Sequence, residues 1–175
     1  MEEGTPGKIL LAVLASFLIL MIMIPLIYHS GAFIGLDGRP GVLDSGWKVA
    51  FADPISKFFY GLGDMFCHQE QDRSFILNGS QLAFCQRDMS ILFGVILGLA
   101  LFLHRRITIF AQDKRALLIG VLLLAITLIE WAIESYFSLD VIGMRVTSGV
   151  ISGIGIAVIF QCLVARQYKA AMAVP

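Results

Sequence analysis

The sequence is poor in charged residues, which make up only 15% of its 175 positions and sum to a formal net charge of zero. Soluble domains carry about 25%. No basic tract is present, which argues against a nucleic-acid partner. The sequence also lacks a phosphate-binding loop, a dinucleotide-binding fingerprint and the Ser/His/Asp order of a hydrolase triad. No nucleotide-dependent or hydrolytic activity is therefore indicated by a motif. Cysteine and histidine are scarce, with three of each.

Apolar residues make up 58% of the chain, and they occur in long blocks rather than evenly. A transmembrane helix needs about 20 predominantly apolar residues. We therefore predict an all-α polytopic membrane protein that forms a single membrane domain over residues 1–175, with the lipid bilayer as its main partner. The predicted transmembrane helices cover residues 8–28, 82–104, 116–137 and 145–166.

Basic residues are distributed unequally between the two predicted sides of the membrane. Four spans place both termini and the 104–115 loop on one side. The basic residues of that side are Lys8, Arg105, Arg106, Lys114, Arg115, Arg166 and Lys169. The positive-inside rule then predicts a multi-pass protein of the cell membrane with both termini in the cytoplasm and residues 29–88 facing outward.

The first outer loop contains a helical pattern. Asp53-Pro54 is typical of an N-cap followed by proline at the first helical position. Apolar residues recur there with helical spacing, at Trp47, Phe51, Ile55, Phe58, Phe59, Leu62 and Phe66. We predict a helix over residues 54–66 that lies in the membrane interface. A helix packed against the transmembrane bundle explains the pattern equally well.

Four potential metal ligands lie in the polar stretch that precedes the second apolar block: Cys67, His68, Cys85 and Asp88. Two thiolates, one imidazole and one carboxylate make up the four ligands that tetrahedral zinc prefers. We predict one divalent metal ion at the outward membrane face, with zinc favoured. Copper and iron remain compatible, because ligand type alone rarely determines the metal.

The same two cysteines allow other interpretations. A Cys67–Cys85 disulfide would stabilise the fold by about 3 kcal/mol in the chain-entropy model. The pair could instead be a working redox couple, with His68 and Arg87 lowering a thiol pKa, which would make the protein a thiol oxidoreductase. The sequence leaves these alternatives open.

Ionisable residues also lie near the outward ends of the predicted spans. The second and third apolar blocks are too short to cross a bilayer unless each includes charged neighbours. The predicted supporting charge cluster consists of Arg73, Arg87, Glu130, Glu134 and Arg145. Charged groups in a membrane are usually paired and face the interior. The cluster therefore locks the helices together or lines a pocket beneath the cysteines, where it relays protons.

Two Gly-x-x-x-Gly steps occur in the apolar blocks, at Gly94/Gly98 and at Gly149/Gly153. Small residues at this spacing let transmembrane helices approach closely. We predict close packing between helices. The same faces suit a homo-oligomer or other membrane subunits, so a third interpretation is an accessory subunit of a larger membrane complex.

The motifs resemble a family of small prokaryotic integral membrane proteins that is known only as a domain of unknown function. The resemblance rests on Cys67-His68-Gln69, on Arg73-Ser74-Phe75 and on Cys85-x-Arg87, and Gly94 and the segment 145–153 fit it as well. It covers roughly residues 60 to 160. Family members often read Cys-x-Arg-Cys where this chain has Asp88, which argues against a site made of thiols alone. The resemblance implies where the site lies and no activity.

Overall fold

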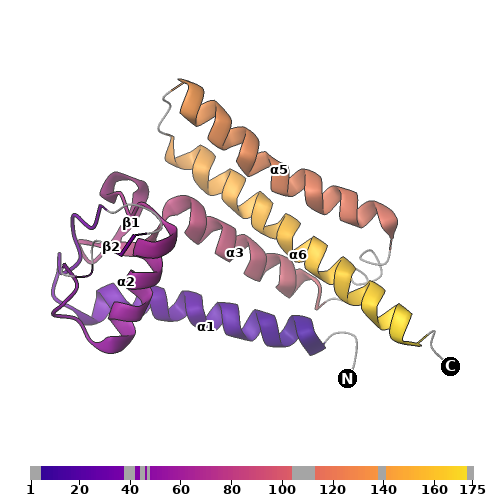
Figure 1. The fold of residues 1–175 in the computed structure, drawn as a ribbon, viewed down its shortest axis with the longest axis horizontal. Coiled ribbons are helices and arrows are strands. Elements are labelled where there is room, and N and C mark those ends of the chain that lie inside the picture. The colour runs from indigo at the N-terminus through magenta and orange to yellow at the C-terminus, as the bar shows by residue number, and fades with distance from the viewer. Residues whose placement is uncertain are drawn as a thin grey trace. The chain divides into compact units, whose positions relative to one another are not determined.

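The computed structural model describes residues 5–37, 42–43, 46, 48–103, 113–137 and 141–172. Its elements are α1 (Thr5–Ile27), α2 (Pro54–Phe66), η1 (Gln71–Arg73), β1 (Ser74–Leu77), β2 (Ser80–Cys85), α3 (Gln86–Leu101), α5 (Lys114–Phe137) and α6 (Ile142–Met172) (Figure 1). The chain divides into two compact units. Unit 1 contains residues 1–16 and 90–175, and unit 2 contains residues 17–89.

Three helices in the described part of the chain are long and apolar enough to cross a membrane. They cover Thr5–Ile27, Arg115–Phe137 and Ile142–Ala171. These segments agree with the first, third and fourth predicted spans. Large aliphatic side chains on α5, such as Leu118, Leu122 and Leu128, are exposed. Contact with lipid explains such exposure, because lipid tails are as apolar as these side chains.

The prediction of a helix over residues 82–104 is wrong at its start. Residues 82–85 belong to β2, which pairs with β1 in an antiparallel hairpin, and α3 begins only at Gln86. The two-residue turn is Asn78-Gly79, and both residues have positive φ, at 51° and 68°. Asn-Gly favours this backbone conformation, which matches the twist of a tight hairpin. The remaining 16-residue helix is about 24 Å long.

The predicted helix over residues 54–66 is confirmed as α2. The Asp53 carboxylate caps its start by accepting hydrogen bonds from the backbone N–H groups of Ile55 (2.8 Å) and Ser56 (3.1 Å). Tyr28, which follows α1, donates its hydroxyl to the same carboxylate at 2.6 Å. Asp53 therefore joins the end of α1 to the start of α2.

The predicted apolar stripe of α2 divides between two surroundings. Phe59 is buried, whereas Ile55, Phe58 and Phe66 are 60%, 59% and 66% exposed. Trp47, which was part of the predicted stripe, lies outside the described residues. One side of α2 thus packs inside unit 2, and the other side presents aromatic and aliphatic groups outward.

Acidification is expected to weaken the junction between α1 and α2. Hydrogen bonds from Ser56 and Tyr28 hold the pKa of Asp53 well below its ordinary value. A carboxyl with a lowered folded-state pKa stabilises the fold above its unfolded-state pKa of about 3.9, and this stability is lost as pH falls below that value. Asp53→Asn should therefore unfold at lower temperature than the wild type at neutral pH. The gap should shrink below about pH 4, and a gap that stays constant through that range would contradict the prediction.

Helices α5 and α6 form an antiparallel hairpin within unit 1. The Thr127 hydroxyl donates to the carbonyl of Ser148 at 3.0 Å, and the Ser152 hydroxyl donates to the carbonyl of Leu123 at 3.0 Å. The backbones approach closely because glycines face one another, and a Cβ built on Gly155 would lie 2.7 Å from the carbonyl oxygen of Gly120. Small residues and hydroxyl bonds are typical of helix pairs in lipid.

The Gly-x-x-x-Gly residues bring α3 against α6. A Cβ on Gly94 would lie 2.2 Å from the Val150 carbonyl oxygen, and one on Gly153 would lie 2.2 Å from the Ile91 carbonyl oxygen. Helix packing inside one chain therefore uses these glycines. Association with further subunits stays a prediction. Because Gly94 and Gly153 already contact a neighbouring helix of the same chain, such association would use other residues.

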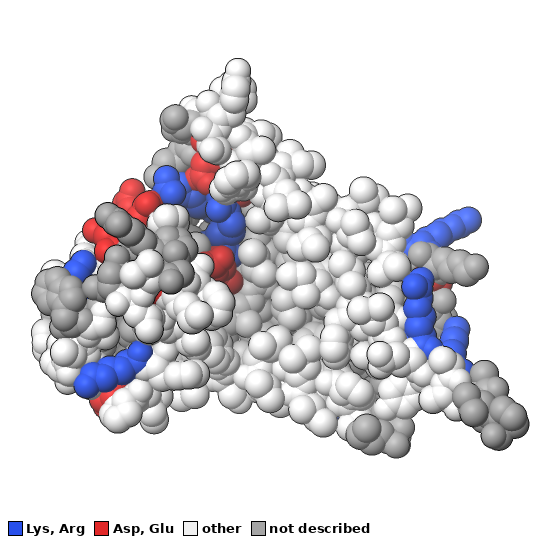
Figure 2. All heavy atoms as spheres, in the orientation of Figure 1, with Lys and Arg blue, Asp and Glu red and all other residues white. Residues whose placement is uncertain are grey.

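The starts of α1 and α5 and the end of α3 lie beside the C-terminal third of α6 in unit 1. A Cβ on Gly7, near the start of α1, would touch the side chain of Gln161 on α6. Phe102, just after α3, belongs to one buried cluster with Ala116 of α5 and Cys162 of α6. Thus α1 and α5 begin, and α3 and α6 end, at the same end. Figure 2 shows Lys and Arg side chains gathered where α6 ends.

Candidate metal centre

Three elements of unit 2 bring two thiols and a carboxylate together. Cys67 follows α2, Cys85 is the last residue of β2, and Asp88 lies in the first turn of α3. Their Sγ and carboxylate oxygen atoms all lie within 4.8 Å of one another. The Cys85 thiol donates a hydrogen bond to Oδ2 of Asp88 at 3.2 Å. Both cysteines are free, so the structure does not contain the alternative disulfide.

The fourth predicted ligand, His68, does not join this group. The backbone at Cys67 is extended, with φ −134° and ψ 152°. Successive side chains of an extended chain point to opposite sides. Accordingly, the Cys67 side chain is buried and that of His68 is exposed. The structure therefore brings together three of the four predicted ligands.

Buried glutamines hold the backbone around the thiols, and sequence reasoning did not identify them. The Gln69 side-chain amide donates to the carbonyls of Tyr60 (3.0 Å) and Ala83 (2.8 Å). The Gln81 side chain in turn donates to the carbonyl of Gln69 at 2.7 Å. A Cβ on Gly63 would lie 1.9 Å from the Ala83 carbonyl oxygen, so glycine allows α2 to approach β2. These contacts fix Cys67 beside the strand that ends at Cys85.

The Gln69 side chain also borders a cavity inside unit 2. Its Oε1 is buried and has no hydrogen-bond partner among the described residues. The cavity has a volume of about 250 Å³, and Lys57 and Asp64 also line it. A cavity of this size, with Lys57 and Asp64 in its otherwise mainly apolar wall, has room for an ordered water, which would satisfy the glutamine oxygen.

The two thiols differ in acidity. Hydrogen bonding with the Cys85 side chain lowers the pKa of Cys67, although burial opposes this effect. The same hydrogen bond, together with burial and the negative charge of Asp88, raises the pKa of Cys85. The pair therefore loses its first proton from Cys67 and resists losing the second. A divalent cation would favour the doubly deprotonated form, because metal ligation requires thiolates.

Several residues of the predicted charge cluster form ion pairs with an acidic or basic partner. In unit 1, Arg145 forms an ion pair with Glu134 and is 2% exposed. In unit 2, Arg73 pairs with Glu70 at 2.9 Å, and both side chains are substantially exposed. Arg87, which adjoins Asp88, is half-buried in the first turn of α3. The Glu134–Arg145 pair joins the facing ends of α5 and α6.

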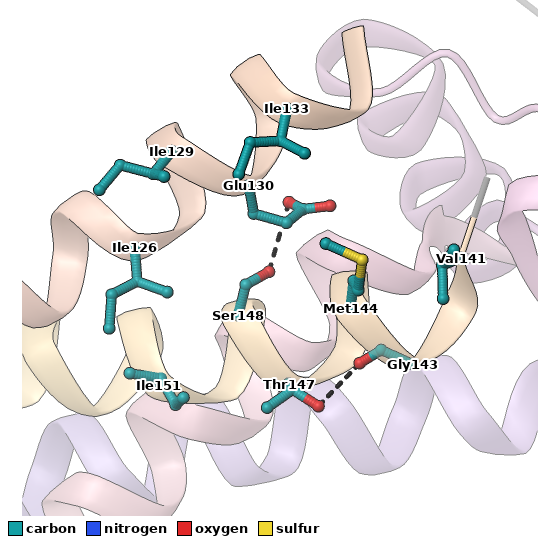
Figure 3. Close-up of a pocket in the computed structure, with 10 residues that line it drawn as sticks. All are labelled: Ile126, Ile129, Glu130, Ile133, Val141, Gly143, Met144, Thr147, Ser148 and Ile151. Carbon is teal, nitrogen blue, oxygen red and sulfur yellow. Dashed lines mark hydrogen bonds between the residues drawn. The ribbon is translucent and has the colours of Figure 1, made fainter. Parts of the chain in front are cut away.

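Glu130, the remaining member of that cluster, lies in a groove between α5 and α6 (Figure 3). Its carboxylate points between the helices and accepts a hydrogen bond from Ser148 at 3.3 Å. The groove has a volume of about 640 Å³ and is otherwise lined mainly by aliphatic side chains such as Ile126 and Ile133. None of the described residues that line it is a cysteine or a histidine, so its chemistry differs from that of the thiol centre.

Long apolar helices with lipid-compatible surfaces, joined by a buried ion pair, define the chain as a helical membrane protein. Residues 67–159 match the family described as Predicted membrane protein (DUF2085), and the chain belongs to this family. The predicted resemblance is thereby confirmed. No curated protein and no solved structure matches the chain. The matched segment begins at Cys67 and includes Cys85 and Asp88, so the whole candidate centre lies within it.

Proposed function

We propose that Cys67, Cys85 and Asp88 bind one divalent metal ion, and that zinc is the ion. The supporting observation is the meeting of two free thiols and a carboxylate within 4.8 Å. Zinc bonds of about 2.0–2.3 Å at tetrahedral angles separate ligand atoms by about 3.5–4 Å. Small side-chain rotations would bring the three groups to that spacing. The hard carboxylate beside two thiolates suits zinc better than Cu(I), which prefers soft ligands.

Three protein ligands leave one tetrahedral position for water or a substrate atom. Structural zinc sites usually have four protein ligands, whereas catalytic sites keep one position open. The proposed ion would therefore polarise a bound water or a substrate oxygen, in addition to tying α2, β2 and α3 together. The charge of the ion would also favour deprotonation of Cys85, whose pKa is raised by hydrogen bonding with Cys67, by burial and by the charge of Asp88.

A second function has support from the thiol pair itself. Cys67 and Cys85 share a hydrogen bond, and the pKa of Cys67 is lowered. Such a pair suits thiol–disulfide exchange, because the thiolate is the nucleophile. In that reaction the two thiols would lose two electrons and two protons to a partner disulfide, which would become a dithiol as the Cys67–Cys85 bond forms.

We further propose that α1, α3, α5 and α6 all cross the membrane, with both termini in the cytoplasm. Helices α1 and α5 begin, and α3 and α6 end, at the same end of unit 1. The chain must therefore return across the membrane between α1 and α5, and α3 is the helix in position to do so. The exposed residues Lys8, Arg115, Arg166 and Lys169 support a cytoplasmic location for that end.

Elemental analysis of the full chain tests the metal proposal. The protein would be purified in mild detergent without chelator, and both bound metal and reactive thiols would be counted. The proposal expects one zinc ion per chain, together with release of reactive thiols when a chelator removes the ion. Metal-free protein whose two thiols close reversibly into a disulfide would reject zinc and favour the exchange reaction.

A further inference from the structure

Hydrogen bonds from Tyr28 and Asn78 hold one end of unit 2 beside the C-terminal end of α1. Tyr28 donates its hydroxyl to Asp53, the cap of α2, at 2.6 Å. The side-chain amide of Asn78, in the hairpin turn, donates to the carbonyls of Pro25 and Tyr28, each at 3.0 Å. Both the start of α2 and the tip of the hairpin therefore lie where α1 ends.

Two aromatic contacts hold another part of unit 2 beside the middle of α1. The ring of Phe17 lies 4.7 Å from that of Phe59 on α2 and 6.5 Å from that of Phe84 on β2, measured between centroids. Phe17 precedes Tyr28 by eleven residues, which is about 16 Å of helix. The five steps of β2 from Ser80 to Cys85 also cover about 16 Å. Both α2 and the hairpin thus run back along α1 for about half of its length.

We infer that unit 2 re-enters the membrane beside α1. In this arrangement the centre of Cys67, Cys85 and Asp88 lies near the middle of the bilayer rather than at its outer surface, where the sequence places it. The hydrocarbon layer is about 30 Å thick, so a descent of about 16 Å reaches its middle. The exposed face of α2, formed by Ile55, Phe58 and Phe66, then contacts lipid acyl chains. This inference rests on the proposed crossing of the membrane by α1 and is independent of the metal.

The buried glutamines provide what a re-entrant segment needs. Non-helical backbone at membrane depth is tolerated only where protein or enclosed water satisfies its polar groups. Gln69 and Gln81 are fully buried and bond backbone groups rather than one another's side chains. Oε1 of Gln81 also accepts from the N–H of Leu36 at 3.2 Å, and the Gln86 amide donates to the carbonyl of Ser74 at 3.2 Å.

The length of α3 agrees with a start below the outer surface. Its 16 residues cover about 24 Å, which is short of the hydrocarbon thickness of about 30 Å. Because α3 ends beside the start of α5, at the proposed cytoplasmic end, Gln86 would lie at least about 6 Å below the opposite surface. A start within the bilayer is compatible with the re-entry of unit 2.

The surface of unit 2 around η1 is charged and exposed, unlike the apolar face of α2. The Glu70–Arg73 pair is 37% and 45% exposed, and Asp72 between them is exposed as well. These residues directly precede Ser74, which pairs with Cys85. Exposed charges at that level are expensive in lipid, so the proposed placement requires this side to face water. In this arrangement unit 2 has a lipid face on α2 and an aqueous face on η1.

Tryptophan quenching by brominated lipids tests this placement. The native Trp47 and Trp131 would be replaced by phenylalanine, and one tryptophan would then be introduced in place of Phe58. The full chain would be reconstituted in phosphatidylcholine vesicles brominated either near the headgroup or in the middle of the acyl chain. Fluorescence of the Phe58→Trp variant should fall most with mid-chain bromines. A control variant, Ile27→Trp, carries its tryptophan at the end of α1, and its fluorescence should fall most with bromines near the headgroup.

A third variant, Asp72→Trp, reports on the aqueous face. Acrylamide in the water should quench it, whereas bromines at either depth should not. Stronger quenching of Phe58→Trp by acrylamide or by headgroup-proximal bromines would overturn the inference. Loss of all quenching would mean that protein covers α2, and it would overturn the lipid contact. Zinc content of the same samples is measured separately, so a failed metal proposal and a failed placement are told apart.

Discussion

Cys85→Ser is expected to abolish stoichiometric zinc binding by the purified chain. A serine hydroxyl stays protonated at neutral pH and is a weak zinc ligand, so only Cys67 and Asp88 would remain. Loss of a residue that merely orients a ligand already lowers metal affinity by about 10–100-fold, and loss of a ligand should exceed the upper end of that range. Competition with a zinc-selective fluorescent chelator measures the change.

Two other variants control this experiment. Cys162→Ala removes a thiol that is fully buried in α6 among apolar neighbours, and it should leave zinc binding unchanged. Asp88→Asn keeps the shape of the side chain but removes its charge, so it should weaken binding less than Cys85→Ser does. Undiminished zinc in Cys85→Ser, or equal loss in Cys162→Ala, would show that the ion binds elsewhere.

Gly153→Leu is expected to separate α3 from α6 and to destabilise unit 1 severely. Even a single Cβ at this position would lie 2.2 Å from the Ile91 carbonyl oxygen and 2.7 Å from the backbone nitrogen of Val95. Overpacking a core usually costs about 1–3 kcal/mol. The cost here should exceed that range, because the obstructing atoms belong to the backbone and cannot rotate away.

The loss of stability in unit 1 can be measured on heating by the reactivity of the buried Cys162 thiol. Cys162 is fully buried, so a thiol-reactive dye labels it only when unit 1 opens. With Cys67 and Cys85 replaced by serine, the labelling temperature should fall sharply in Gly153→Leu. Gly143→Leu is the matched control on the same helix, because a Cβ there meets nothing within 4 Å. Similar temperatures for both variants would contradict the predicted α3–α6 contact.

The helices were the most predictable part of this molecule. The Asp53-Pro54 pair alone places the start of α2, because the cap and the proline both act locally. Long apolar blocks likewise predict α1, α5 and α6, since length and composition determine whether a segment suits the bilayer. Such features do not depend on residues distant in sequence.

The hairpin was missed although a signal for it exists. Asn78-Gly79 lies between two runs rich in apolar residues, which is a strong short-range indication of a two-residue turn. Its importance depends on pairing with distant groups, since the Asn78 amide bonds the end of α1. The demand for a helix long enough to cross the membrane favoured an early start at Leu82. The structure instead has two strands before α3, and they fold back along α1.

The candidate centre was only partly predictable for a similar reason. Cys67, Cys85 and Asp88 were identified by residue type and by proximity to a helix start. The exclusion of His68 follows from the extended backbone at Cys67, which no local motif indicates. The roles of Gln69 and Gln81 depend on carbonyl groups contributed by other segments, so their own sequence context carries no signal.

The Glu134–Arg145 pair also bears on how the chain enters the bilayer. Inserted alone, α5 would carry one unbalanced carboxylate near its end and α6 one unbalanced guanidinium near its start. Each would raise the cost of insertion, by less than the figure of about 2.5–3.5 kcal/mol that applies at the centre of a membrane helix. Entering together as a preformed hairpin, the two charges neutralise each other before they leave water. The translocation machinery should therefore release α5 only after α6 has emerged, which makes their insertion a single event during biosynthesis.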